Sequence, residues 1–224
     1  MNNWLNPDNK FFTFMGKAFD MVVLNTVWLI LCIPVITIVP ATTALYYAVV
    51  KVIRRERSYA VKEFFRSFKR NFKQGALFSL LAVVLIFVMY IDFRYAWELM
   101  QAQNSSGSTY FGVFLVIAIL FSAMYAYVCP VLSRFDMRLG GILKTSFVMA
   151  TRHLLTTIAL LILLVGVLLG CYVLLPGIFF LPAIGTLVSS FLIERVFKKY
   201  MPAKEEPAEG EEEAGQEKDE WYLE

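Results

Sequence analysis

An uninterrupted apolar run constrains the fold of this chain more than any other feature. Residues Leu154 to Leu175 read LLTTIALLILLVGVLLGCYVLL and include no charged side chain. A helix of about 20 such residues crosses the hydrocarbon core of a bilayer. Hydrophobic residues make up 58% of the 224-residue chain, whereas soluble domains hold ~45–50%. The sequence therefore predicts an integral membrane protein of the all-α class.

Other apolar stretches predict a polytopic transmembrane helical bundle that occupies residues 1–200. Ala76–Tyr95 and Tyr110–Leu132 have the length of simple spans, and a last helix is expected at about Ile178–Phe197. Together with the run that starts at Leu154 and a first segment near the N-terminus, they give five to six spans.

Prolines break the first apolar segment, which starts near Ala18. Pro34 and Pro40 each lack a backbone donor and clash with the preceding helical turn. We expect the stretch between them to be extended or kinked, and a second helix to begin at Ala41. A single span here gives five spans with the N-terminus outside. A hairpin gives six with the N-terminus inside, which Lys10 and Lys17 favour.

A basic amphipathic segment follows at about residues 58–73. Phe64, Phe68 and Phe72 recur at helical spacing on one face. The other face carries five cations, namely Lys62, Arg66, Lys69, Arg70 and Lys73. A helix of this kind lies in the membrane interface and is attracted to anionic lipids. These residues therefore predict an interfacial helix that offers a docking surface for lipid or a partner.

Lysine and arginine predict the orientation. Lys51–Lys73 holds nine of them and Arg134–Arg152 holds four, whereas Trp97–Thr109 and Pro176–Phe180 hold none. Cytoplasmic loops carry the excess of these residues, so we expect the basic loops and the C-terminus to be cytoplasmic. The second basic loop is expected to contain an amphipathic helix from about Gly141.

The end of the chain differs in composition from the rest. Residues 201–224 hold ten of the 18 acidic side chains and few apolar ones. Such a segment buries too little surface to offset the entropy of ordering. We expect an acidic, disordered cytoplasmic tail.

No set of residues amounts to an active site. The three cysteines show no C-x-x-C spacing, and the one histidine, His153, has no partner at metal-ligand spacing. P-loop, H-E-x-x-H and G-x-S-x-G motifs are absent. We expect no enzyme activity, no metal and no cofactor, and we interpret the basic charge as orientation rather than nucleic-acid binding.

Ionisable residues near the spans are functional candidates. Arg94 and Glu98 have the i, i+4 spacing of a helical ion pair. With Asp92 they form either a solute or proton site or an anchor at the membrane interface. Glu194 in the last helix is expected to pair with a basic residue.

Two signatures resemble a known family. The segment PVITIVPATTALYY, Pro34 to Tyr47, and the segment FFRSFKRNFKQG, Phe64 to Gly75, resemble the YesL-like family of bacterial membrane proteins. The resemblance implies a Gram-positive plasma membrane and an association with carbohydrate uptake and two-component sensing. It implies no known activity and no catalytic residues.

Two functions remain open. One is an accessory component of a carbohydrate uptake (ABC transport) or sensing system, with transporter or sensor-kinase subunits as partners. The other is a small-solute permease or channel that uses the helix break at Pro34–Pro40, because broken helices expose backbone groups to ligands. Its lining would come from Thr37, Thr42, Thr43 and Tyr46.

Overall fold

The computed structural model describes residues 10–55, 59–102 and 105–200, and every regular element in these ranges is helical. The α-helices are α1 (Lys10–Leu31), α2 (Ile38–Ala48), α3 (Ala60–Gln101), α4 (Ser105–Arg134), α5 (Leu139–Arg152), α6 (Leu154–Val173) and α7 (Leu181–Phe197). Short 3-10 helices η2 (Val35–Thr37) and η4 (Leu175–Phe179) and a π-helix η3 (Val49–Arg54) connect them. The predicted all-α class is confirmed over these residues, and the acidic segment 201–224 lies outside them.

Four helical segments in the described ranges are long and apolar enough to cross a membrane. They are Val35–Arg54, Ala60–Gln101, Gly107–Arg134 and Leu154–Val173. Two of these contain the spans expected at Ala76–Tyr95 and Tyr110–Leu132, and a third covers all but the last two residues of the expected span Leu154–Leu175. The predicted helix from Gly141 is also present, as α5, which begins two residues earlier. The total of five or six spans stays a prediction.

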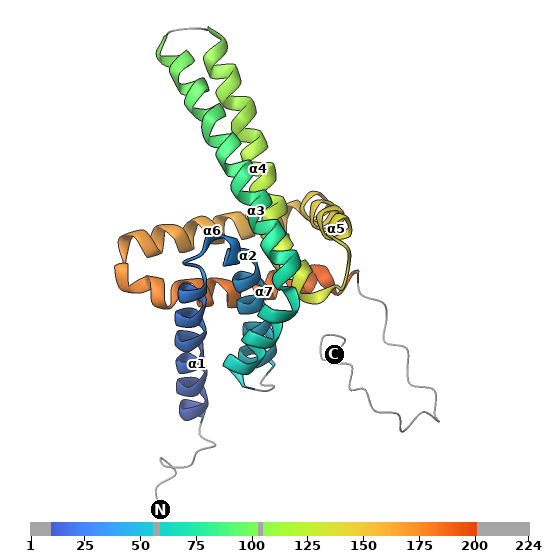
Figure 1. Cartoon of the computed structure of the whole chain (residues 1–224). Helices are drawn as coiled ribbons and strands as arrows, with labels where there is room; N and C mark the ends of the chain where they lie inside the picture. Colours follow the sequence, from blue (N-terminus) through green and yellow to red (C-terminus); the bar gives the residue numbers. More distant parts are fainter. Residues whose placement is uncertain (1–9, 56–58, 103–104, 201–224) are drawn as a thin grey trace, which may run out of the picture.

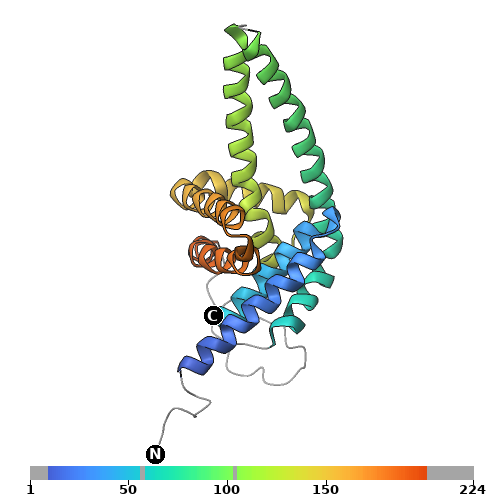
Figure 2. The ribbon, with the colours of Figure 1, turned by 90° about the vertical axis from the view of Figure 1, so that its left-hand side faces the viewer.

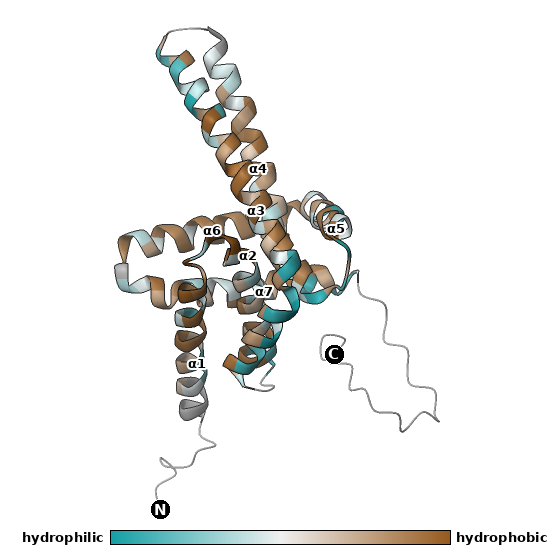
Figure 3. Ribbon diagram, in the orientation of Figure 1, coloured by the Kyte–Doolittle hydropathy of each residue, from teal (hydrophilic) through white to brown (hydrophobic). Residues whose placement is uncertain are grey.

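Two apolar hairpins project from the body of the protein and run crosswise to each other. The first consists of α3 and α4, and the second of α6 and α7 joined through η4 (Figure 1). In the turned view, α3 and α4 lie closest at their shared turn and separate toward the body (Figure 2). Hydrophobic residues cover the middle of both hairpins, whereas the first part of α3 mixes hydrophilic and hydrophobic residues (Figure 3). Large apolar side chains on both hairpins are exposed, which suits lipid rather than water.

Helix α2 is the centre of the molecule. In the apolar segment that contains it, 83% of the residues are buried inside the protein, against 11% in α6. The small side chains of Ala41, Ala44 and Ala48 are fully buried and let neighbouring helices approach closely. It contacts α1, α3, α4 and α7. This apolar segment therefore meets protein on nearly all sides, whereas α3, α4 and α6 expose large apolar side chains.

The break before α2 is shorter than the sequence predicts. Helix α1 ends at Leu31, Pro34 is extended with φ −77° and ψ 126°, and α2 already starts at Ile38. Pro40 is the third residue of α2, a position in the first turn where the missing N–H has no intrahelical partner to lose. The proline break is thus present, but the expected extended stretch up to Pro40 is largely helical.

Helix α3 joins the basic segment and the following span without interruption. It has 42 residues, about 63 Å at 1.5 Å per residue, roughly twice the hydrocarbon thickness of a bilayer. The separate interfacial helix expected at 58–73 is not seen, since its described residues form the first part of α3. Phe64 on its apolar face is fully buried in a cluster with Leu45 and Ala48 of α2. Packing on α2, rather than lipid, covers that part of the face.

Helices α2 and α3 pack against each other at one close contact, between Gly75 and Pro40. A Cβ atom added to Gly75 would lie 2.9 Å from the Pro40 ring and its backbone nitrogen. One turn further along α3, the Ser79 hydroxyl accepts a 3.0 Å hydrogen bond from the backbone N–H of Val39. That N–H lies in the first turn of α2, where helices leave donors unsatisfied. Gly75 therefore allows the approach, and Ser79 caps α2 from a different helix.

Gly75→Ala is expected to lower the free energy of unfolding by about 1–3 kcal/mol, because the added methyl overpacks against Pro40. Alanine ordinarily stabilises a helix by about 1 kcal/mol relative to glycine. A loss of stability on this substitution would therefore identify the close contact. Gly112→Ala in α4 is the matched control, since its Cβ would meet nothing within 4 Å. The measurement is thermal unfolding in detergent. An equal increase in thermal stability in both variants would contradict the close contact.

Candidate functional site: a buried ionic network

The C-terminal end of α2 carries a group of buried charges. The chain reads KVIRR over residues 51–55, and its first four residues belong to the π-helix η3. Single-turn π-helices are rare and occur often at functional sites. Of the three cations of this stretch, Lys51 contacts α3, and Arg54 and Arg55 contact α7. They form, with their partners, what we call the ionic network.

Glu194 of α7 is the centre of the network. Its Oε1 accepts hydrogen bonds from Arg134 at the end of α4, from Nε at 3.1 Å and from Nη2 at 2.5 Å. The Tyr46 hydroxyl of α2 donates to the same oxygen at 3.1 Å, and Arg55 Nη2 lies 3.9 Å from Oε2. The side chains of Glu194 and Arg134 are only 4% and 1% exposed. One carboxylate thus joins α2, α4, α7 and the end of η3.

A second buried pair joins η3 to α3. Lys51 Nζ lies 3.1 Å from Oε2 of Glu63, and both side chains are buried. The same ammonium lies 5.6 Å from the centre of the Tyr47 ring, a cation–π distance. Arg66 Nη1 is 3.9 Å from the other oxygen of Glu63. This pair fixes the start of α3 against the end of α2.

Arg54 ties η3 to α7 without a carboxylate. Its Nη1 donates a 3.1 Å hydrogen bond to the Ser190 carbonyl oxygen. Its guanidinium carbon lies 4.5 Å from the centre of the Phe191 ring, and a planar guanidinium stacks well on such a face. Arg54 therefore holds α7 beside Glu194 of the same helix.

The chemistry of this site is charge pairing inside an apolar body. Moving one ion out of water costs several kcal/mol, which a well-formed pair recovers only when its remaining donors and acceptors are also bonded. Over the described residues, no three His, Cys, Asp or Glu side chains come together as a metal site. The arrangement holds helices in register.

Three of the four residues expected to line a solute site are held by protein groups. Thr37 donates its hydroxyl to the carbonyl oxygens of Leu31 and Pro34, the latter at 2.6 Å, and so satisfies groups freed by the helix break. Thr42 donates to the Ile38 carbonyl oxygen at 2.7 Å. It also accepts a hydrogen bond from the indole N–H of Trp28 in α1. Tyr46, as shown above, bonds to Glu194.

The bond from Trp28 Nε1 to Thr42 Oγ1, at 3.2 Å, joins α1 to α2. Thr43 differs from the other three. It is fully buried, its Oγ1 makes no hydrogen bond of ordinary length among the described residues, and it lies beside the Cys129 thiol. The four side chains therefore share one helix and its N-terminal turn but serve separate contacts.

The predicted basic docking residues share one exposed surface of α3. The five exposed residues are Lys62, Arg66, Lys69, Arg70 and Lys73. Arg70 lies 3.7 Å from Asp136 in the α4–α5 loop, an exposed pair. Ser67 and Phe64 on the other side of the helix are buried. The structure thus separates a packed face from the cationic face named by the sequence.

Sequence reasoning expected a cation beside Glu194 without identifying it. The partner, Arg134, is 60 residues away, so no local spacing indicates it. It also missed Glu63, whose signal was its position as an isolated acid within a run of cations. The expected pair of Arg94 with Glu98 is present at 3.4 Å on the exposed surface. Local pairs were readable from spacing, whereas long-range pairs required the fold.

Glu194→Gln is expected to lower the free energy of unfolding by about 3–5 kcal/mol, because it removes the negative charge that Arg134 meets in the interior. Glu98→Gln is the matched control. It breaks an ion pair whose side chains are both more than 60% exposed, and such pairs contribute about 0–1 kcal/mol. Thermal unfolding in detergent measures both. A loss of the same small size in both variants would contradict the central role of Glu194.

Comparison with known proteins agrees with the signatures in the sequence. The family described as "Protein of unknown function, DUF624" matches residues 21–93, which contain the second half of α1, all of α2 and η3, and most of α3. The chain is 28% identical to "Uncharacterized protein YesL" of Bacillus subtilis (strain 168) over 199 residues, 87% of this chain and 90% of that protein. No solved structure matches. These two similarities confirm the predicted resemblance to the YesL-like family, whose function is unknown.

Proposed function

We propose that this protein is a non-enzymatic, multi-pass component of the bacterial plasma membrane that docks other proteins at its cytoplasmic side. Its suggested role is that of an accessory subunit in a carbohydrate uptake (ABC transport) or associated sensing system. The partners would be transporter or sensor-kinase subunits. The carbohydrate assignment rests on the family resemblance alone, and the docking role rests on the cationic face of α3.

The cationic face supports docking through its position and its rigidity. A bilayer needs about 20 of the 42 residues of α3, and the apolar stretch after Gly75 supplies them. The preceding residues carry five exposed cations while Phe64 and Glu63 fix the same segment to the body. A rigid, positively charged helix outside the hydrocarbon suits an acidic protein surface or anionic headgroups.

The proposed orientation makes a labelling prediction. In a background with Cys32, Cys129 and Cys171 replaced by alanine, two exposed positions probe the turn ends of the hairpins. They are Thr109→Cys near the start of α4 and Pro176→Cys in η4. Both are expected to react with a membrane-impermeant maleimide applied to intact cells.

The control for that experiment is Lys199→Cys, an exposed position after α7. It is expected to react only after the membrane is opened, because the basic ends face the cytoplasm. Labelling of this position in intact cells would contradict the orientation. The turn of α6–α7 is the more informative probe, since that hairpin runs crosswise to α3–α4 (Figure 1).

The docking role is tested by affinity isolation from crosslinked native membranes with mass spectrometry. We expect transporter or sensor-kinase subunits to co-isolate, and a triple variant Lys62→Gln, Lys69→Gln and Lys73→Gln to lose them. The matched control also removes three exposed cations, through Arg152→Gln, Lys198→Gln and Lys199→Gln. Recovery of no such subunit, or equal recovery with both triple variants, would contradict the proposal.

One observation favours the second candidate, a small-solute permease. The hydroxyl of Thr43 is buried without an ordinary hydrogen bond among the described residues, and such a group costs about 1–3 kcal/mol. A solute that enters the helix break would supply the missing bond. Flux of a small solute into liposomes that Thr43→Val abolishes, with folding intact, would favour this function over docking. Thr42→Val is the comparison, because Thr42 already bonds to Ile38 and Trp28.

A further inference from the structure

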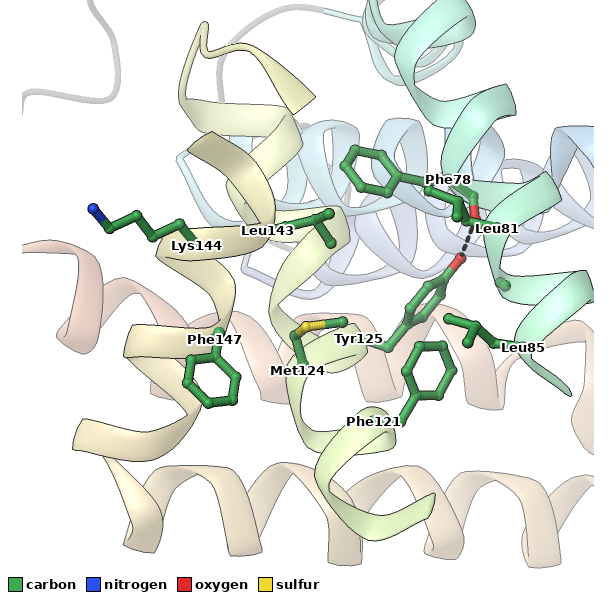
Figure 4. A pocket seen from close by; sticks show the side chains of 10 residues that line it. Phe78, Leu81, Leu85, Phe121, Met124, Tyr125, Leu143, Lys144 and Phe147 are labelled. Carbon is green, nitrogen blue, oxygen red and sulfur yellow. Dashed lines mark hydrogen bonds between the residues drawn. The ribbon is translucent and has the colours of Figure 1, made fainter. Parts of the chain in front are cut away.

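An apolar cavity lies where α3 and α4 separate above the body. It has a volume of about 380 Å³, within the range of small-molecule sites. Phe78, Leu81 and Leu85 of α3 line one wall, so the cavity runs along two turns of that helix. Phe121 and Tyr125 of α4 line the opposite wall, and α5 closes the third side (Figure 4).

Apart from Lys144 at its edge, the lining offers no free polar side chain to an occupant. The only hydroxyl among the lining side chains belongs to Tyr125, and it donates a 3.2 Å hydrogen bond to the Phe78 carbonyl oxygen (Figure 4). Sites for sugars and other polar solutes hold several groups that bond to the ligand. The cavity walls therefore suit a hydrocarbon chain and disfavour a carbohydrate.

The cavity is open to the surroundings of the hairpin. Leu81 and Leu85 are both partly exposed, and Phe147 of α5 is 53% exposed. In the apolar part of α3 only 17% of the residues are buried inside the protein. In a membrane these surfaces face lipid, so acyl chains have direct access to the cavity.

One charge stands at the edge of this apolar space. The aliphatic stem of Lys144 contributes to the lining, while its ammonium points away from the cavity (Figure 4) and the residue is exposed. A lysine in this position covers apolar surface with its stem and keeps its charge at the interface. The edge thus combines a hydrocarbon site with a cation that attracts a negative headgroup.

We propose that the cavity between α3, α4 and α5 binds one acyl chain of an anionic phospholipid, with Lys144 contacting the headgroup. This inference rests on the proposed membrane residence and not on the docking role. The site is distinct from the cationic face of α3, because none of the five cations lines the cavity. It makes the lipid a structural part of the junction between the α3–α4 hairpin and α5.

The test is native mass spectrometry of the purified protein in a mild detergent, titrated with palmitoyl-oleoyl phosphatidylglycerol or with the phosphatidylcholine of the same chains. We expect one tightly bound phosphatidylglycerol. Lys144→Gln should weaken it about fivefold, the loss expected for one cation near an anionic headgroup, and leave phosphatidylcholine unchanged. Lys62→Gln, an exposed lysine of the cationic face, is the control and should change neither.

Variants that fill the cavity test the chain site. Ala82→Phe places a ring in the cavity from α3 and should reduce the affinity for both lipids. Leu81→Trp fills it from the exposed edge and serves where Ala82→Phe fails to fold. Equal binding of the two lipids that neither filling variant changes would overturn the proposal. A dimer that the filling variants dissociate, without bound lipid, would assign the cavity to a second copy of the chain and also overturn it.

Discussion

The carboxylate of Glu194 is the constraint on which the arrangement of the body depends. It is buried, and it accepts bonds from Arg134 at the end of α4 and from Tyr46 in α2. A buried charge is tolerated only where partners are held at bonding distance. Helices α2, α4 and α7 must therefore meet at one point, and Arg54 and Arg55 of the connecting segment meet there too. Hydrophobic packing alone has no comparable directional requirement.

The enclosed helix α2 lies in the least apolar of the four candidate spans among the described residues. Lipid offers no hydrophobic drive for one apolar helix to leave it for another, so close packing and polar contacts decide which helix is enclosed. Helix α2 supplies both, through its alanines on one hand and Tyr46 and Val39 on the other. Helix α6 lies in the most apolar of these four spans and remains on the outside. Thr157, near its start, bonds to α4 and α5.

The length of α3 connects the two proposed functions to the fold. One end is fixed to the body by Glu63 and Lys51, and the contact of Gly75 with Pro40 holds the helix near its middle. The cationic face lies on one side of that contact and the apolar cavity on the other. A partner bound to the cations and a lipid bound beside Phe78 would thus act on the same rigid rod. The cavity itself exists because α3 and α4 diverge toward the body (Figure 2).

The sequence by itself determined the all-α membrane class, most helix positions, the cationic face and the local pair Arg94–Glu98. Each of these depends on spacing within one or two helical turns or on the length of an apolar run, which are local properties. Only the tertiary structure decided that α2 is enclosed, that the basic segment continues into α3, and that Glu194 meets Arg134. Burial and long-range pairing depend on which helices touch, and the apolar pattern of a membrane helix looks the same whether lipid or protein covers it.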